Sequence, residues 1–144
     1  MWLNKAEVQR LDAFHYKCLR RCLGIPHSYI SHITNEYVLQ QAGGVTLSKR
    51  VLAQQLDMYA RYARMGNSAV TRQYVFEADS FEPRSWPGQK RKGRPRNSWV
   101  KNVHELAVSI ADNSIHRLQQ LLADTPQAHK EWRACVHRAL FART

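Results

Sequence analysis

Residues 4–26 read NKAEVQRLDAFHYKCLRRCLGIP, and this stretch indicates the fold class. Its apolar side chains recur every three or four residues, which predicts one apolar stripe along a helix. The stripe consists of Val8, Leu11, Phe14, Cys18, Leu19 and Cys22. Asn4 with Glu7 matches a capping box at the start, and Gly24 followed by Pro26 ends the helix. The side chains expected off the stripe, on a basic outer face, are Arg10, Lys17, Arg20 and Arg21.

Helical patterns with similar spacing follow along the rest of the chain. They predict helices over residues 35–42, 47–65, 98–110, 115–122 and 126–140. The polar residues placed to cap them are Thr34, Thr46 or Ser48, Asn97 or Ser98, Ser114, and Thr125 before Pro126. Residues 68–78 fit either a short helix or an extended segment. Because patterns typical of strands are nearly absent, we expect an all-α fold.

Residues 81–97 interrupt these helical patterns. The stretch contains the helix breakers Pro83, Pro87, Gly88, Gly93 and Pro95, which are too many for a regular element. We therefore expect two small helical parts, residues 1–80 and 98–144, joined by a Pro/Gly-rich basic linker over 81–97.

The charge of the chain is concentrated in one place. Of 144 residues, 22 are Lys or Arg and 11 are Asp or Glu, for a net charge of +11. Residues 83–103 hold seven basic side chains and no acidic one, whereas residues 1–82 have a net charge of +3 and residues 104–144 of +1. A basic cluster of this kind favours a polyanionic partner, and nucleic acid above all.

Several classes of protein are disfavoured by composition. No apolar run approaches the roughly 20 residues of a membrane-spanning helix, and the N-terminus lacks the basic and apolar regions of a signal peptide. Three cysteines, Cys18, Cys22 and Cys135, are too few for a disulfide scaffold. We expect an intracellular protein of the nucleus or cytoplasm, with no membrane partner.

Four stretches, taken in order, resemble a known family. They are RLDAFHYKCLRRCLGI at 10–25, TNEYVL at 34–39, KRKGRPRNSW at 90–99 and HKEWRACV at 129–136. The predicted helix over 47–65 is similar to a long helix of the same family. Together these motifs resemble the region in or after the thumb of LINE-type (non-LTR) retrotransposon reverse transcriptases.

The resemblance implies a C-terminal fragment that does not carry the chemistry of its parent enzyme. Nucleotidyl transfer requires paired aspartates that hold two metal ions. The aspartates here are Asp12, Asp57, Asp79, Asp112 and Asp124, which are scattered and never adjacent. We therefore expect a non-catalytic module that grips template RNA or target DNA in the parent enzyme and that packs against the missing palm and thumb.

The candidate binding site is the basic segment, which we define as residues 84–101. Its phosphate-neutralising side chains are Arg84, Lys90, Arg91, Lys92, Arg94, Arg96 and Lys101. Contacts of this kind are largely independent of sequence and are driven by counterion release. Trp86 could stack on an unpaired base, and Arg20 and Arg21 are further candidates. Trp99 lies on an apolar helix face, so we expect it in the core.

Two alternatives compete with this interpretation. Lys92-Gly93-Arg94-Pro95 resembles the core of an AT-hook, which would make the chain a free-standing binder of A·T-rich minor grooves. A helical interaction protein from a truncated element, without a ligand of its own, is the alternative of a different class.

Metal binding and catalysis have little support in the sequence. Cys18, Cys22, His27 and His32 have spacings close to those of a zinc knuckle, but both cysteines fall on the predicted apolar stripe, where core packing is the simpler role. Asp12 and His15 could meet on one helix, yet no nucleophile accompanies them. We expect no cofactor, no metal and no small-molecule substrate.

Overall fold

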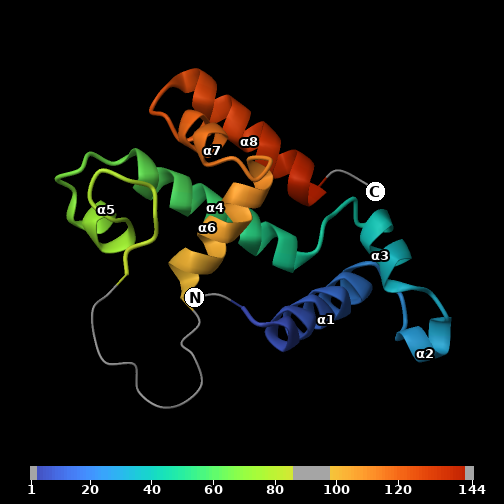
Figure 1. The fold of residues 1–144 in the computed structure, drawn as a ribbon. Helices are drawn as coiled ribbons and strands as arrows, with labels where there is room; N and C mark the ends of the chain where they lie inside the picture. The colour runs from blue at the N-terminus through green and yellow to red at the C-terminus, as the bar shows by residue number, and fades with distance from the viewer. Residues whose placement is uncertain (1–2, 86–97, 142–144) are drawn as a thin grey trace, which may run out of the picture. The chain divides into compact units, whose positions relative to one another are not determined.

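A computed structural model describes residues 3–85 and 98–141. The elements run α1 Lys5–Cys22, α2 Ser28–Ser31, α3 Asn35–Gln41, α4 Leu47–Arg64, α5 Val70–Val75, α6 Trp99–Ile110, α7 Ile115–Leu121 and α8 Pro126–Phe141 (Figure 1). In these ranges the only β-pairing is an isolated antiparallel bridge between Phe76 and Pro83. The predicted all-α fold is confirmed. Among the helices of the described residues, only the short α2 was not predicted by the sequence patterns.

The caps of the helices follow the predicted polar residues. Asn4 accepts a hydrogen bond from the Glu7 amide at 3.0 Å, and the Glu7 carboxylate accepts one from the Asn4 amide at 2.7 Å, which completes the capping box. Thr34 and Ser114 cap α3 and α7, where their hydroxyls accept hydrogen bonds from the Tyr37 and Arg117 amides. Gly24, at φ +66°, supplies the left-handed residue that ends α1.

The chain divides into two compact units, and the boundary lies inside α4, between Leu52 and Ala53. The first unit, Leu3–Leu52, contains α1, α2, α3 and the first turns of α4. Asp12 of α1 accepts hydrogen bonds from the Ser48 amide at 3.0 Å and the Ser48 hydroxyl at 2.7 Å. Asp12, one member of the possible Asp12–His15 pair, therefore has a structural role, because it holds the start of α4.

The predicted apolar stripe of α1 is only partly buried. Within residues 3–52, all of which the structure describes, Val38 is the only hydrophobic side chain in the fully buried class. Phe14 is 63% exposed and Cys22 is also exposed, so the prediction that both pack in a core is wrong. The helix is rotated so that its inner face runs through Leu11, His15 and Leu19, which leaves Phe14 facing outward.

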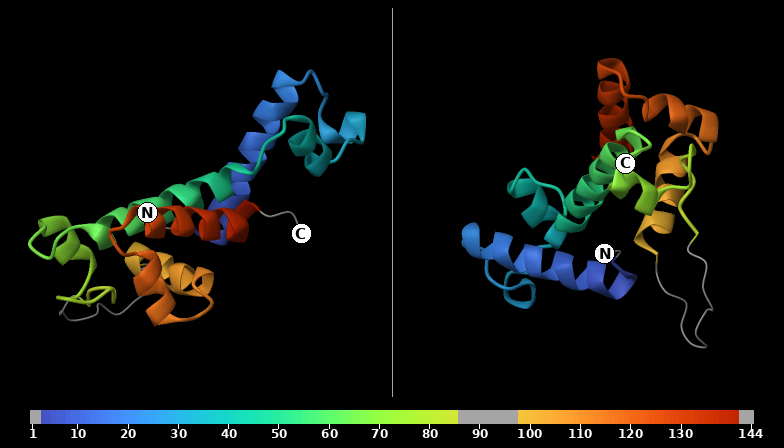
Figure 2. Two further views of the ribbon diagram at one scale, coloured as in Figure 1. Left: turned by 90° about the horizontal axis from the view of Figure 1, so that it is seen from above. Right: turned by 90° about the vertical axis from the view of Figure 1, so that its left-hand side faces the viewer.

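The second unit contains the main hydrophobic core. Its residues come from the second part of α4, from the α5 region and from α6, α7 and α8, and Figures 1 and 2 show α6 and α8 beside this part of α4. The largest fully buried side chains of this core are Trp132, Tyr59, Phe76, Leu56, Leu118, Leu121, Leu122 and Val103. Tyr59 and Phe76 meet edge to face, with ring centroids 5.3 Å apart.

This core contradicts the predicted division into residues 1–80 and 98–144. Leu56 and Ala60 of α4 lie in one cluster with Val103 of α6 and Trp132 of α8. Residues 53–80, before the 81–97 stretch, and residues 98–141, after it, therefore belong to one unit. The breaker residues do not mark the boundary between the units, which falls within the continuous helix α4.

The ambiguous stretch 68–78 adopts both of the predicted conformations in turn. Residues 70–75 form α5, and Phe76 is extended, with φ −118° and ψ 153°. Phe76 then pairs with Pro83, so that residues 77–82 form a turn. We call residues 76–83 the bridge turn, because it leads directly into the basic segment.

Candidate nucleic-acid interface

Arg84 lies where the bridge turn joins the basic segment. Its amide donates to the Val75 carbonyl at 2.9 Å, and its guanidinium donates to the Gln73 carbonyl. The Ser85 amide donates to the Glu77 carboxylate at 2.8 Å. The chain is thus fixed to the folded unit up to the last described residue before the gap, while the Arg84 side chain remains exposed.

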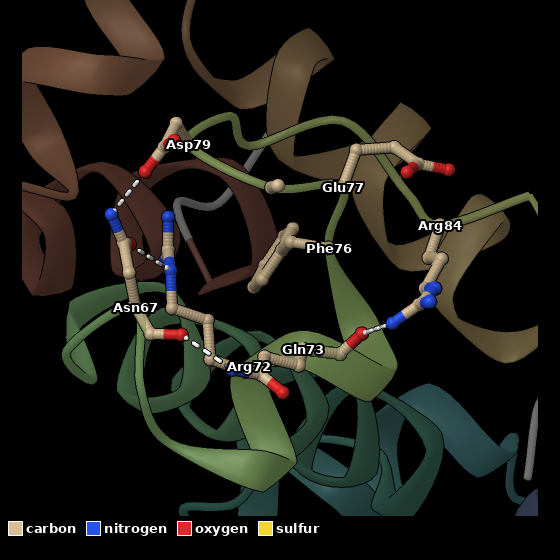
Figure 3. A pocket seen from close by; sticks show the side chains of 8 residues that line it. Asn67, Arg72, Gln73, Phe76, Glu77, Asp79 and Arg84 are labelled. Atoms are coloured by element: carbon tan, nitrogen blue, oxygen red, sulfur yellow. Dashed lines mark hydrogen bonds between the residues drawn. The ribbon is translucent and has the colours of Figure 1, made fainter.

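A buried arginine holds the bridge turn in place (Figure 3). Arg72 of α5 is only 6% exposed. Its Nε donates to Asn67 Oδ1 at 2.9 Å, one Nη donates to the Ala63 carbonyl and the other donates to the Ser80 carbonyl at 3.1 Å. Arg72 therefore connects the end of α4, the following loop and the bridge turn through one side chain.

Two aromatic rings cover the Arg72 guanidinium. Its central carbon lies 5.3 Å from the centroid of the Phe76 ring and 5.1 Å from that of Phe81. Both distances are within the range of a cation–π interaction, which is strongest where water is excluded. The local sequence contains no signal that Arg72 is buried, although the neighbouring Phe76 and Phe81 are consistent with an aromatic environment.

The Arg72 cluster borders a shallow polar pocket of about 370 Å³ (Figure 3). Its charged lining residues are Arg72, Glu77, Asp79 and Arg84. Both carboxylates already accept hydrogen bonds, Asp79 from the side-chain amide of Asn67 and Glu77 from the Ser85 backbone amide. These hydrogen bonds hold the residues that lead into the basic segment. The mixed charge of the pocket favours no single class of ligand.

The other end of the basic segment enters α6. The Ser98 hydroxyl accepts a weak hydrogen bond from the Lys101 amide at 3.5 Å, so Ser98 is the cap, and the Lys101 side chain is exposed. Trp99 is half-buried and packs edge to face on Tyr62, with centroids 6.4 Å apart. The prediction that Trp99 anchors its helix in the core is confirmed.

The middle of α6 is fixed to α4 by a polar pair inside the core. The hydroxyl of the fully buried Tyr59 lies 2.8 Å from His104 Nδ1. Burial raises the pKa of Tyr59, so the phenol keeps its proton. Burial also lowers the pKa of His104, and the nearby Glu82 and Glu105 oppose that effect only in part.

The free energy of unfolding should therefore decrease as the pH is lowered, because His104 takes up a proton more readily in the unfolded chain. The unfolded chain binds a proton at an ordinary histidine pKa of about 6.5, whereas the folded chain binds it only at lower pH. As the pH falls below about 6.5, the unfolded state takes up the proton first and the free energy of unfolding decreases. Urea unfolding at a series of pH values measures this loss. His104→Gln should lose less stability over the same range, and an identical pH profile for both chains would contradict the assignment.

The predicted site residues fall into three groups. Trp86, Lys90, Arg91, Lys92, Arg94 and Arg96 lie outside the described residues. Arg84, Lys101 and Arg21 are exposed. The prediction that Arg20 lies on an exposed basic face is wrong, because this side chain is 6% exposed and its guanidinium donates to the Pro26 carbonyl at 3.0 Å and to Asn35 Oδ1 at 3.1 Å.

The buried Arg20 has a structural role similar to that of Arg72. It ties the end of α1 to the segment that leads into α3, and its second donor nitrogen also reaches the Ile33 carbonyl. Its backbone carbonyl also accepts from the Ile25 amide at 2.9 Å, just beyond the helix end. A long side chain at the edge of the inner face can reach these acceptors, which hydrophobic periodicity alone does not reveal.

The zinc-like spacing is not matched by a metal-binding geometry. Over residues 3–85 and 98–141, no three His, Cys, Asp or Glu side chains are grouped so that they could hold a metal ion. The three cysteines are free thiols. In the same ranges, no helix is both long enough and apolar enough to cross a membrane.

Comparison with known proteins adds no relative from which a function could be transferred. No family model, no curated protein and no solved structure matches the chain. The functional interpretation therefore depends on the charge distribution, on the sequence motifs and on the geometry of the described residues.

Proposed function

We propose that this chain is a non-catalytic nucleic-acid-binding module and that the basic segment is its main contact with phosphates. The observation that carries the proposal is the run of seven cations between Arg84 and Lys101, within which no acidic residue occurs. The described part of the second unit, residues 53–85 and 98–141, has nine basic and eight acidic side chains and is nearly neutral. The affinity for a polyanion therefore comes from the segment rather than from the unit that carries it.

The two ends of the segment support this role. Arg84 and Lys101 are both exposed, and both belong to one folded unit. Fixing the two end residues of a cationic segment in one folded unit lowers the entropy that is lost when the segment binds a phosphate backbone. The motifs that resemble LINE-type reverse transcriptases make template RNA or target DNA the proposed partner in a parent enzyme.

A second function, that of a helical interaction protein, is favoured by one observation. The first unit exposes large apolar side chains at α2 and α3, where Tyr29 is 72% and Ile30 is 60% exposed and Tyr37 is also exposed. Surfaces of this kind are typical of protein interfaces when they are contiguous. Such a protein would not bind nucleic acid more tightly than its net charge requires.

The test is the salt dependence of binding for a variant in which Arg91, Lys92, Arg94 and Arg96 are all changed to Gln. Each phosphate contact contributes about −0.9 to the slope of log K against log salt on duplex DNA. We expect the slope to become shallower by about 3 to 4, and affinity at low salt to fall by about 100-fold or more. Fluorescence anisotropy with duplex DNA, single-stranded DNA and RNA measures both quantities.

A matched control removes the same number of charges elsewhere. Lys49, Arg50, Lys130 and Arg138 are exposed residues on α4 and α8, and their change to Gln should weaken binding far less. Equal losses for the two variants would mean that net charge alone drives binding, which contradicts the proposal. If the unmodified chain binds A·T tracts more tightly than G·C tracts, the AT-hook alternative is favoured instead.

A further inference from the structure

The binding role proposed for the basic segment does not use a row of exposed side chains on α1. Arg10, Phe14, Lys17 and Arg21 follow spacings of four, three and four, which place them on one face of the helix. All four are exposed. We call these residues the α1 outer face; it lies opposite Leu11, His15 and Leu19, which point into the unit.

The α1 outer face is cationic because the acidic side chains of the first unit lie outside it. Residues 3–52 contain seven basic and three acidic side chains. Asp12 is bound to Ser48, and Glu7, at the N-terminal border of the face, accepts the Asn4 amide in the capping box. Glu36 lies in the first turn of α3. No acidic side chain therefore lies within the face between Arg10 and Arg21.

The aromatic ring in the middle of this face distinguishes it from an ordinary solvated helix surface. Phe14 is 63% exposed, and the cations Arg10, Lys17 and Arg21 lie one or two turns away along the helix. A phenyl ring has no polar atom to solvate, so a partner that covers it gains the free energy of removing apolar surface from water. A ring bordered by cations matches the chemistry of single-stranded nucleic acid, in which an unpaired base stacks on the ring and the flanking phosphates meet the cations.

We propose that the α1 outer face is a second nucleic-acid-binding surface, selective for single strands. Arg10 and Arg21 are three turns apart, about 16 Å at 1.5 Å per residue, which is long enough for the face to follow several phosphates. Duplex bases are already stacked on one another and offer no free face to Phe14, so the aromatic contact is specific to unpaired bases. A membrane is the weaker fit, because an interfacial helix needs a broad apolar face and this one presents a single ring among cations.

The test compares Phe14→Ala with the parent chain in binding a labelled oligouridylate, an oligothymidylate and a DNA duplex. Loss of one stacking contact should weaken single-strand binding by about tenfold and leave the salt slope and duplex binding unchanged. Phe14→Trp should restore single-strand binding. Tyr29→Ala, which removes an exposed aromatic on α2, is the matched control and should bind as the parent does.

The cations are tested separately by changing Arg10, Lys17 and Arg21 together to Gln. Three lost phosphate contacts should make the single-strand slope shallower by about 2, at about 0.7 per contact. Changing Lys130, Arg133 and Arg138 on α8 to Gln removes the same charge from another exposed surface and should alter the slope much less. Equal melting temperatures for all these chains verify that folding is unchanged.

The α1 variants are also made in the chain whose basic segment has been neutralised, so that the two surfaces can be judged independently. The Phe14 effect should persist there, even if the segment itself proves unimportant. The proposal is overturned if Phe14→Ala binds the single strand as tightly as the parent, or if it weakens single strand and duplex equally. Phe14-dependent binding to phosphatidylserine vesicles, with single-strand affinity unchanged, would also overturn it in favour of a membrane surface.

Discussion

Changing Arg72 to Met should lower the free energy of unfolding by about 3–4 kcal/mol, within the range found when a buried charged network is broken. Methionine retains most of the aliphatic stem, so little packing is lost. It removes all the guanidinium donors, and the carbonyls of Ala63 and Ser80 lose their partner near or inside the core. Each such group costs about 1–3 kcal/mol when it is left unsatisfied. The cation–π contacts with Phe76 and Phe81 are lost as well.

Two further substitutions make the Arg72 result specific. Arg72→Lys keeps the charge but not the planar fork, so it should recover only part of the lost stability. Arg61→Met removes an exposed arginine that pairs with Asp57 at 2.6 Å on α4, and it should cost less than about 1 kcal/mol. Urea unfolding followed by circular dichroism gives the three values. If Arg72→Met unfolds at the same urea concentration as Arg61→Met, Arg72 does not hold the bridge turn.

The helices and their ends could be predicted from the sequence because the signals are local. The capping box at Asn4, the Gly24 turn and the Thr125-Pro126 start each depend on residues within one helical turn. The same holds for the all-α class, since three- and four-residue periodicity recurs on both sides of residues 81–97. The four-residue helix α2 lies below the length at which such periodicity can be recognised.

The boundary between the units could not be predicted, because it depends on contacts between residues distant in sequence. Pro and Gly residues show where regular structure stops, but they do not show whether the flanking helices share a core. Leu56 and Trp132 are far apart in the chain and lie in one cluster. A boundary inside α4 leaves no local signal at all, since the helix is continuous there.

The burial of Arg20 and Arg72 and the exposure of Phe14 could not be predicted for the same reason. Periodicity places Arg20 on the outer face of its helix and Phe14 on the apolar stripe. Arg20 and Arg72 are buried because backbone carbonyls from other segments satisfy their donors. The binding role of the basic segment remains a prediction from charge. The α1 outer face, by contrast, can be recognised only from the observed rotation of α1.

Changing Trp132 to Ala should lower the free energy of unfolding of the second unit by about 3–5 kcal/mol, the range for truncating a fully buried large aromatic side chain. Trp132 is 1% exposed and belongs to the main core, so its removal leaves a cavity that the surrounding side chains fill only in part. Trp132→Phe should cost clearly less. Ile115→Ala, at the half-exposed start of α7, should cost about 1 kcal/mol or less.

Hydrogen exchange after the Trp132→Ala change distinguishes the observed arrangement from the one that the sequence suggested. Because Tyr59 and Ala60 lie in the same core as Trp132, the amides of the second part of α4 should lose protection together with those of α6 and α8. If residues 1–80 were a separate unit, as the breaker residues suggest, the α4 amides would keep the protection of the parent chain. Such a result would show that α4 does not share the Trp132 core, and with it that Arg84 and Lys101 are not held by one folded unit.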